Sequence, residues 1–234
     1  MKEEYYRWYS HPIGRDFEML VFGHAGYPVV LFPTSRGRYY ENKDFGLIGA
    51  VGWLIDQGRV RIYCPDSIDG LSWYNRSIHP ADRIRNHLRY EQVIRDEVIG
   101  RARWETGRGQ VAVAGCSFGA YHATCFGFRH LDLVSHVFNM GGAFNIKPQL
   151  DGYYSEDAYF VNPVDFIPNL NDHRLYHKGL TFGCGEWDFC RPSNEHLSGV
   201  LRAKGVGNWL DVRPGYEHNW EPWKVMFPDY LAQL

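Results

Sequence analysis

The sequence has no long apolar segment and no surplus of charge of either sign. Its longest mostly apolar stretch, residues 46–55, is about half of the roughly 20 residues that a membrane-spanning helix needs. The 25 Lys and Arg residues are balanced by 27 Asp and Glu residues, which leaves a formal net charge of −2. Because no basic excess is available to attract nucleic acid or an anionic membrane, we expect neither as a partner.

Cysteine is scarce, with an odd total of 5, and the N-terminal residues MKEEY carry acidic side chains where a signal peptide would turn apolar. Cys64, Cys116 and Cys184 lie inside or at the ends of apolar runs that are typical of strands. Buried, reduced thiols are the ordinary state of such cysteines in a reducing compartment. We therefore expect a cytoplasmic protein, and a Cys184–Cys190 disulfide is the alternative.

The composition indicates a folded chain with a large core. Hydrophobic residues make up 44% of the chain and charged residues 22%, which excludes a disordered, collagen-like or coiled-coil protein. Aromatic residues make up 16%, enough to line a pocket as well as the core. We expect one domain over residues 1–234, because a chain of this length buries roughly 70% of its unfolded surface without disulfides or metal.

Short apolar runs alternate with longer segments of helical periodicity. The runs expected to form strands are 5–10, 17–22, 28–32, 60–64, 110–114, 134–140, 180–184 and 209–212. The segments expected to form helices are 44–57, 80–103, 120–128, 191–204 and 219–234. After an initial antiparallel pair, this alternation predicts an α/β fold with a mostly parallel sheet and helices on both faces.

Residues 147–178 interrupt this alternation. The segment holds several prolines and aromatic residues and shows no sustained periodicity. An insertion of about 30 residues in a compact domain is usually a lid, a binding loop or a disordered segment. Its aromatic content favours a packed, lid-like insertion.

The most informative motif is Gly-x-Ser-x-Gly at Gly115–Gly119, which follows an apolar strand and opens a helix. This is the setting of a nucleophile elbow, a sharp turn that lifts a serine hydroxyl clear of the sheet. The motif predicts Ser117 as the nucleophile and the N–H of Phe118 as a donor to a developing oxyanion. A glycine-rich turn with an ordinary capping serine is the alternative.

An activated serine needs a base, and the base needs an orienting acid. In this type of fold the order along the chain is serine, acid, histidine. His218 lies in a loop between the last strand and the last helix, whereas His196 lies inside an expected helix. We therefore predict His218 as the base. Asp188 is the preferred acid and Glu186 the alternative, although either could instead cap the helix that follows.

Two further loops follow strands and are expected near the site. The loop after residue 32 would supply the second oxyanion donor, the backbone N–H of Thr34 or Ser35. Arg36 in the same loop is a candidate substrate contact, although a solvated loop explains it equally well. Trp73 and Tyr74 follow another strand, and we expect them at the pocket.

Metal-binding patterns are weak. Asp172-His173 and His177 have helical spacing but lack a third ligand nearby. Cys184, Cys190 and His196 could be combined into a zinc site, but Cys184 is better explained as part of a strand. We assign no metal.

Three segments together resemble a known family: the Gly115–Gly119 motif, the Ser67–Tyr74 loop and the ending His218-Asn219-Trp220-Glu221-Pro222-Trp223. They are similar to the esterase family of α/β hydrolases that includes S-formylglutathione hydrolases, feruloyl esterases and mycolyltransferases. The loop and the ending are most similar to the mycolyltransferases. We also predict that Trp220 of this ending contacts the substrate.

The resemblance implies an α/β-hydrolase fold and ester hydrolysis or acyl transfer without a cofactor. Ser117, His218 and Asp188 or Glu186 would carry the reaction on a small-molecule ester. We predict a serine esterase. An acyltransferase using the same acyl-enzyme and a non-catalytic scaffold are the alternatives, and the sequence leaves open whether the chain forms a homo-oligomer.

Overall fold

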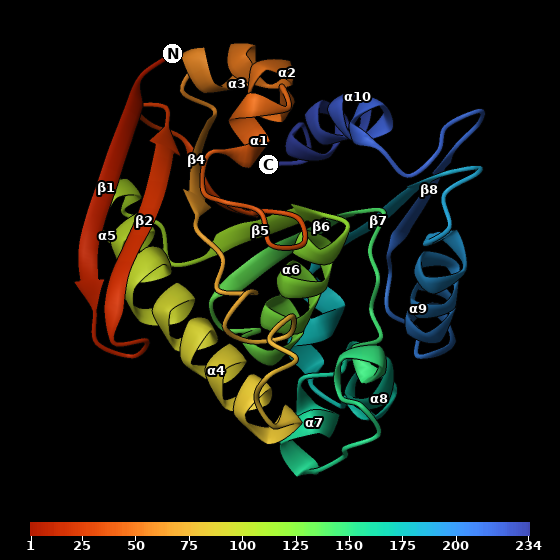
Figure 1. The fold of residues 1–234 in the computed structure, drawn as a ribbon. Helices are drawn as coiled ribbons and strands as arrows, with labels where there is room; N and C mark the ends of the chain where they lie inside the picture. The colour runs from red at the N-terminus through yellow and green to blue at the C-terminus, as the bar shows by residue number, and fades with distance from the viewer.

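The computed structural model describes all residues 1–234 and is built on one eight-stranded sheet (Figure 1). The strand order is β1-β2-β4-β3-β5-β6-β7-β8. The strands are β1 (Glu3–Ser10), β2 (Arg15–Phe22), β3 (Tyr27–Phe32), β4 (Val60–Pro65), β5 (Val111–Cys116), β6 (Val134–Met140), β7 (Gly179–Gly185) and β8 (Trp209–Arg213). The expected α/β-hydrolase fold with a mostly parallel sheet is confirmed.

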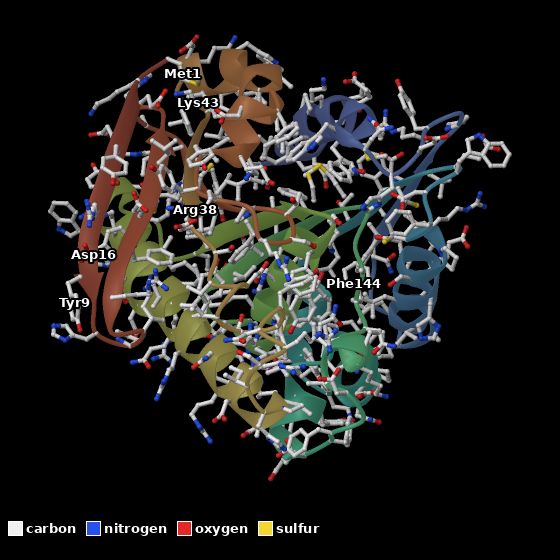
Figure 2. The ribbon with its side chains drawn as sticks, in the orientation of Figure 1. Met1, Tyr9, Asp16, Arg38, Lys43 and Phe144 are labelled. Atoms are coloured by element: carbon white, nitrogen blue, oxygen red, sulfur yellow. The ribbon has the colours of Figure 1, made fainter.

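The first two strands form an antiparallel hairpin at one end of the sheet, and β2 joins β4 in antiparallel register. Tyr9 and Asp16 project from this hairpin (Figure 2). All pairs from β4 to β8 are parallel. Because parallel strands end at the same edge of a sheet, the loops after β3, β4, β5, β7 and β8 share one edge.

The helices cover both faces of the sheet, and none is long and apolar enough to cross a membrane. The helices and helical turns are α1 (Glu41–Asp44), α2 (Leu47–Ala50), α3 (Gly52–Asp56), α4 (Pro80–Gln92), η1 (Val93–Ile99), α5 (Gly100–Thr106), α6 (Phe118–Arg129), η2 (Lys147–Gln149), α7 (Glu156–Phe160), α8 (Pro163–Phe166), η3 (Ile167–Asn169), η4 (His173–His177), α9 (Arg191–Ala203) and α10 (Trp220–Leu231).

The prediction of a single helix over residues 44–57 is wrong, because α1 ends at Asp44 and the rest of the segment forms the separate short helices α2 and α3. Gly46 adopts φ 82° between the first two, a left-handed conformation that an α-helix cannot contain. Val51 separates the second from the third. The helix expected over 80–103 is continuous, but its middle, η1, is a π-helical stretch.

Alternation along the strands creates two cores. Val29 and Leu31 face a core closed by α2, α3 and α10, whereas Val30 and Phe32 face a core closed by η1, α5, α6 and α9. The two groups of helices lie on opposite sides of the sheet (Figure 1). Phe144, just after β6, is fully buried in the second core (Figure 2). The strands buried on both faces therefore carry continuous apolar runs.

Residues 147–178 fold into the short helical turns from η2 to η4. They are tied to the body of the protein by hydrogen bonds: Tyr121 Oη donates to the Val161 carbonyl at 3.0 Å, and Lys204 Nζ to the Pro168 carbonyl at 2.7 Å. The segment is thus packed. Its expected role as a lid stays a prediction.

The turn between β5 and α6 is closely packed against β3. A Cβ on Gly115 would overlap the backbone of Gly119, and a Cβ on Gly119 would lie 2.6 Å from the Pro33 carbonyl oxygen and 2.7 Å from that of Phe32. Real Cβ atoms do not approach backbone so closely, because packed interiors leave no space for an added methyl group. Glycine at both positions is therefore a steric requirement of this turn.

Gly115→Ala should lower the free energy of unfolding by about 3 kcal/mol, the upper end of the range for atoms forced into a packed core. That corresponds to a Tm lower by roughly 10 °C for a chain of this length. Thermal unfolding followed by circular dichroism measures the change. Gly109→Ala is the matched control, since a Cβ there meets nothing within 4 Å. Equal stability of the two variants would contradict the steric argument.

Candidate active site

Ser117, His218 and Asp188 form one chain of close polar contacts at the carboxyl edge of the sheet. Ser117 Oγ lies 2.9 Å from His218 Nε2, and His218 Nδ1 lies 2.8 Å from Asp188 Oδ1. A carboxylate only accepts hydrogen bonds, so the imidazole proton belongs on Nδ1 and Nε2 is left as an acceptor for the serine hydroxyl. The arrangement is that of a nucleophile, a base and an orienting acid.

Ser117 stands in a strained backbone conformation. Its φ is 54° and its ψ is −118°, values that residues with a Cβ rarely adopt. Its N–H donates to the Met140 carbonyl of β6 at 2.8 Å, which holds the turn against the neighbouring strand. The following residue, Phe118, begins α6, so its N–H has no acceptor within the helix and lies at the positive end of the helix dipole.

Of the two candidate acids, Asp188 is the one in contact with His218. Its side chain is completely buried, and its Oδ1 also accepts the N–H of Cys190 at 2.7 Å. The Glu186 carboxylate instead accepts the N–H of Gly215 at 2.9 Å, in the loop that carries His218. Glu186 therefore holds the histidine loop without touching the imidazole.

The loops after β7 and β8 are bonded directly to each other. Trp187 N–H donates to the Tyr216 carbonyl at 2.8 Å, and Glu186 N–H donates to the Arg213 carbonyl at 2.8 Å. A Cβ on Gly185 would overlap Tyr216, so the two backbones meet only because residue 185 is glycine. These contacts fix Asp188 relative to His218.

The loop after β3 carries the backbone N–H groups of Thr34 and Ser35, the two groups predicted as the second oxyanion donor. Thr34 N–H donates to Glu41 Oε2 at 2.7 Å and is therefore occupied, whereas Ser35 N–H has no acceptor within the protein. Of the two predicted donors, only Ser35 is free to bind an oxyanion. Burial raises the pKa of Glu41, and the two hydrogen bonds from Thr34 oppose that rise.

Arg36 and Tyr74 come together beside this donor. The Arg36 guanidinium lies 4.8 Å from the centre of the Tyr74 ring. Tyr74 Oη donates to Ser35 Oγ at 2.8 Å, and its ring meets the Phe118 ring edge-on at 5.3 Å. An exposed cation and an aromatic ring thus lie beside Ser35 and Phe118, the residue that follows Ser117.

The expectation that Trp73 contacts substrate is wrong. Its side chain is 0% exposed and packs against His87 and Tyr121, with ring centres 4.9 and 6.1 Å away. Trp73 lies inside the third hydrophobic cluster of the protein, whereas the next residue, Tyr74, is half-buried at its border. The turn in the Ser67–Tyr74 loop therefore directs adjacent side chains to opposite sides.

Trp220 lies near the site, and Trp223 contacts both it and the His218 imidazole. Trp220 stacks on the exposed Phe45 with ring centres 4.7 Å apart and an angle of 7° between the rings. It also contacts Trp223 at 5.2 Å, and the Trp223 ring lies 5.1 Å from that of His218. The ending thus places Trp223 beside the His218 ring and Trp220 against Trp223.

Phe189 was not predicted from the sequence, yet its ring centre lies 4.2 Å from that of His218. The side chain is 76% exposed, which is unusual for a large apolar residue beside a polar group. The only sequence signal was its position next to Asp188. Phe189 covers one face of the imidazole and presents the other side of its own ring to solvent.

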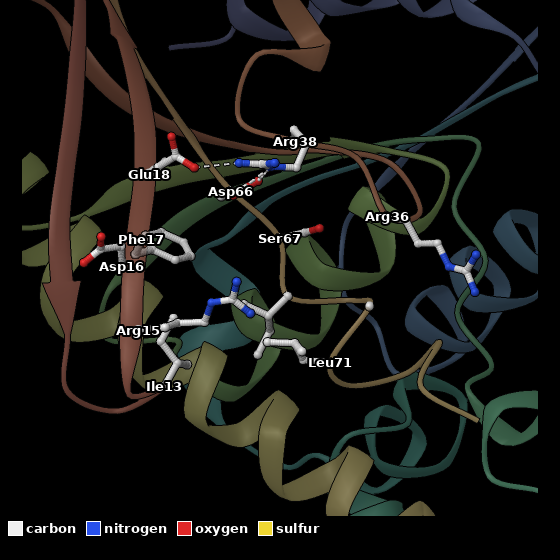
Figure 3. A pocket seen from close by; sticks show the side chains of 12 residues that line it. Ile13, Arg15, Asp16, Phe17, Glu18, Arg36, Arg38, Asp66, Ser67 and Leu71 are labelled. Carbon is white, nitrogen blue, oxygen red and sulfur yellow. Dashed lines mark hydrogen bonds and ion pairs between the residues drawn. The ribbon is translucent and has the colours of Figure 1, made fainter. Parts of the chain in front are cut away.

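A cavity of about 360 Å³ opens beside the loop after β3, on the side of the β1–β2 hairpin (Figure 3). Arg38 is bonded there to Glu18 at 2.6 Å and to Asp66 at 2.9 Å. Arg15, Arg36 and Leu71 also line it, and the Arg36 side chain extends away from those of Arg15 and Leu71 (Figure 3). None of Ser117, His218 and Asp188 is among the residues that line this cavity.

All cysteines are free and buried, so the alternative disulfide between Cys184 and Cys190 is absent. Burial raises the pKa of Cys116 well above its usual value, and its side chain belongs to the core on the far side of the sheet from α6. Cys116 is thus unsuited to act as a nucleophile in place of Ser117.

Two groups of side chains have the residue types of a metal site. The first group consists of Asp188, Cys190 and His218, whose hydrogen bonds to one another are described above. His87, Glu91 and Cys125 have ligand atoms within 4.8 Å of one another, but Glu91 is already bonded to Arg129 at 3.0 Å and to His130 at 2.7 Å. A guanidinium so close competes with a cation for the same carboxylate.

Comparisons with solved structures give strong likenesses in fold. A ferulic acid esterase superposes with a TM-score of 0.79 at 17% identity, covering 99% of this chain and 96% of the other. An S-formylglutathione hydrolase from Agrobacterium tumefaciens gives 0.76 at 13% identity, covering 99% and 93%. A fluorophosphonate-binding serine hydrolase from Staphylococcus aureus gives 0.71 at 12% identity, covering 99% and 97%.

No family model matches the sequence, and no curated protein matches it. At these identities the structural likeness establishes the fold. The resemblance to feruloyl esterases and S-formylglutathione hydrolases that the motifs indicated is thereby confirmed at the level of architecture.

Below the site, α4 buries His87 against His122, with ring centres 5.6 Å apart. Burial, and to a lesser extent the nearby His122, lower the pKa of His87 to about 3. The unfolded chain takes up this proton near pH 6.5, whereas the folded protein does so only near pH 3. Stability should therefore fall as the pH drops through that window.

His87→Gln should remove this dependence. Between pH 7 and pH 5, the free energy of unfolding of the wild type should fall by about 2 kcal/mol more than that of the variant. Urea denaturation at both pH values measures the difference. His11→Gln, at an exposed position, is the control and should behave like the wild type. The same pH dependence in His87→Gln and wild type would show that His87 is not the titrating group.

Proposed function

We propose that this protein is a serine esterase that hydrolyses a small-molecule carboxylic ester through an acyl-enzyme. His218 Nε2 takes the hydroxyl proton of Ser117 as the Ser117 Oγ attacks the ester carbonyl carbon. The carbonyl π electrons move to oxygen, and the N–H groups of Phe118 and Ser35 bind the resulting oxyanion. When the intermediate collapses, the ester bond breaks and His218 gives its proton to the departing alcohol.

Hydrolysis of the acyl-enzyme repeats these steps with water. His218 accepts a proton from water, whose oxygen attacks the acyl carbon, and then returns the proton to Ser117 as the carboxylic acid leaves. Asp188 stays a carboxylate, holds the proton on Nδ1 and stabilises the imidazolium. Every proton and electron pair is accounted for by these groups, so the proposal requires no cofactor.

The observation that carries the proposal is the contact of Ser117 with His218 in a strained turn at the start of a helix. A structural serine needs neither a positive φ nor an imidazole that is itself bonded to a buried carboxylate. The exposed surroundings, with Ser35 and Phe189 open to solvent, support hydrolysis by water over transfer to another alcohol.

Ser117→Ala and His218→Ala should each lower kcat for p-nitrophenyl acetate by on the order of 10⁴-fold, because the three groups act as one unit. Wild-type protein should also be labelled at Ser117 by a fluorophosphonate, and the Ser117→Ala variant should not. His11→Ala is the control for a histidine outside the site. Activity of either site variant within a few-fold of wild type would end the assignment.

The identity of the acid is tested by a matched pair of substitutions. Asp188→Asn should lower kcat by about 10⁴-fold, because an amide in its place favours the wrong imidazole tautomer. Glu186→Gln should stay within a few-fold of wild type, since its amide oxygen can still accept the N–H of Gly215. Steady-state kinetics on p-nitrophenyl acetate compares them. A large loss in Glu186→Gln alone would make Glu186 the acid.

A further inference from the structure

The free N–H of Ser35 lies between two residues that are each tied to a carboxylate. On one side, Glu41 accepts both the N–H and the hydroxyl of Thr34, at 2.7 and 2.9 Å. On the other side, Asp69 Oδ2 accepts the N–H of Arg36 at 3.0 Å. The direction of the Ser35 N–H depends on the peptide planes next to it, so these two carboxylates determine where it points.

Asp69 also reaches the helix that carries the other proposed oxyanion donor. Its Oδ1 lies 3.0 Å from Nε2 of His122, which stands one turn after Phe118 on α6. Asp69 is 1% exposed and His122 is 3% exposed. The His122 ring packs edge-on against Phe118 at 5.1 Å and stacks on Phe32 at 5.8 Å. One buried carboxylate thus joins the loop of Ser35 to the helix of Phe118.

The loop needs such a restraint because Arg36 has a φ of 56°. For a residue with a Cβ, this left-handed conformation is strained, so the free loop would leave it. The loop has no glycine at Thr34, Ser35 or Arg36 that would adopt the conformation without strain. The bond from Arg36 N–H to Asp69 offsets this strain in the folded protein.

The Asp69 side chain is not needed for the shape of its own loop. The turn there is closed by backbone bonds, from Ser72 N–H to the Ile68 carbonyl at 3.0 Å and from Tyr74 N–H to the Asp69 carbonyl at 2.9 Å. Removing the carboxylate leaves these bonds in place. Its contacts with Arg36 and His122 therefore point to a function outside its own segment.

We propose that Asp69 is a positioning residue that sets the oxyanion hole by joining the Ser35 loop to α6, with Glu41 as its counterpart on the other side of Ser35. The inference rests on the proposed esterase reaction. A positioning role differs from a general structural role because loss of the Asp69 carboxylate would weaken binding of the transition state alone. An oxyanion donor binds the tetrahedral intermediate more strongly than the planar ester, so its displacement lowers kcat with little change in KM.

The test uses Asp69→Ala with Asp66→Ala as the matched control. Asp66 is a neighbouring carboxylate that also holds this loop, through Arg38 and the N–H of Tyr39, but farther from Ser35. On p-nitrophenyl acetate, Asp69→Ala should lower kcat about 10- to 100-fold with KM within about three-fold of wild type, since loss of a whole donor costs about 10²–10³-fold. Asp66→Ala should stay within a few-fold in both.

A second readout separates positioning from loosening of the fold. An alkyl trifluoromethyl ketone adds to the active serine as an anionic tetrahedral adduct, so its Ki should rise in Asp69→Ala by the factor by which kcat/KM falls. Asp69→Asn should recover most of the activity, because its oxygen can accept the Arg36 N–H while its amide donates to His122 in the other tautomer. An Asn variant no better than Ala would overturn the proposal.

Asp69→Ala with wild-type kcat, or with a raised KM alone, would also overturn the inference, as would an equal loss in Asp66→Ala. If Asp69→Ala does not fold by circular dichroism, Glu41→Ala decides by the same measurements and limits. The Ser117→Ala variant tests the esterase reaction separately from the positioning role of Asp69. Full activity in Ser117→Ala removes the esterase itself, whereas an inactive Ser117→Ala beside a fully active Asp69→Ala removes only the positioning role.

Discussion

The contact between Ser117 and His218 depends on how closely three backbone segments approach one another after β5. Gly115 and Gly119 leave room for the turn to fold back on itself and for β3 to pass beside it. Ser117, midway between the two glycines, adopts a positive φ, and its N–H donates to the Met140 carbonyl of β6. A serine in that place projects from the carboxyl edge of the sheet, where the loops after the neighbouring strands reach it. The other site residues are arranged around this turn.

Asp188 and His218 owe their relative position to contacts between loops. Asp188 and His218 follow adjacent strands, and the backbones of their loops are hydrogen-bonded to each other before either side chain is considered. Glu186 adds a carboxylate to this connection through Gly215. Two carboxylates two residues apart thus differ in their contacts, since Asp188 meets the imidazole and Glu186 meets the backbone of the partner loop. Such a difference follows from the strand register.

The strands, their mostly parallel arrangement and the helices on both faces were predictable because each leaves a local period in the sequence. The turn at Ser117 was also predictable, because its close packing requires glycine at positions 115 and 119. The short helices α1 to α3 were missed, since an apolar period does not show where Gly46 interrupts it. Trp73 was misplaced because only the folded turn decides which of two adjacent aromatics faces the core. The pairing of Asp69 with His122 joins residues 53 positions apart, and no local pattern encodes it.

The loop after β3 places Arg36, which is not glycine, in a left-handed conformation, and the bond from its N–H to Asp69 opposes that strain. A carboxylate near a developing oxyanion is unfavourable by itself, because the two negative charges repel at low dielectric. Both oxygens of Asp69 already have partners, since one accepts the Arg36 N–H and the other lies within hydrogen-bond distance of His122 Nε2. The Arg36 guanidinium beside Tyr74 adds a positive charge from the same residue that Asp69 restrains. Arg36 therefore combines a left-handed backbone, which Asp69 restrains, with a guanidinium over the Tyr74 ring, a group that glycine at this position could not supply.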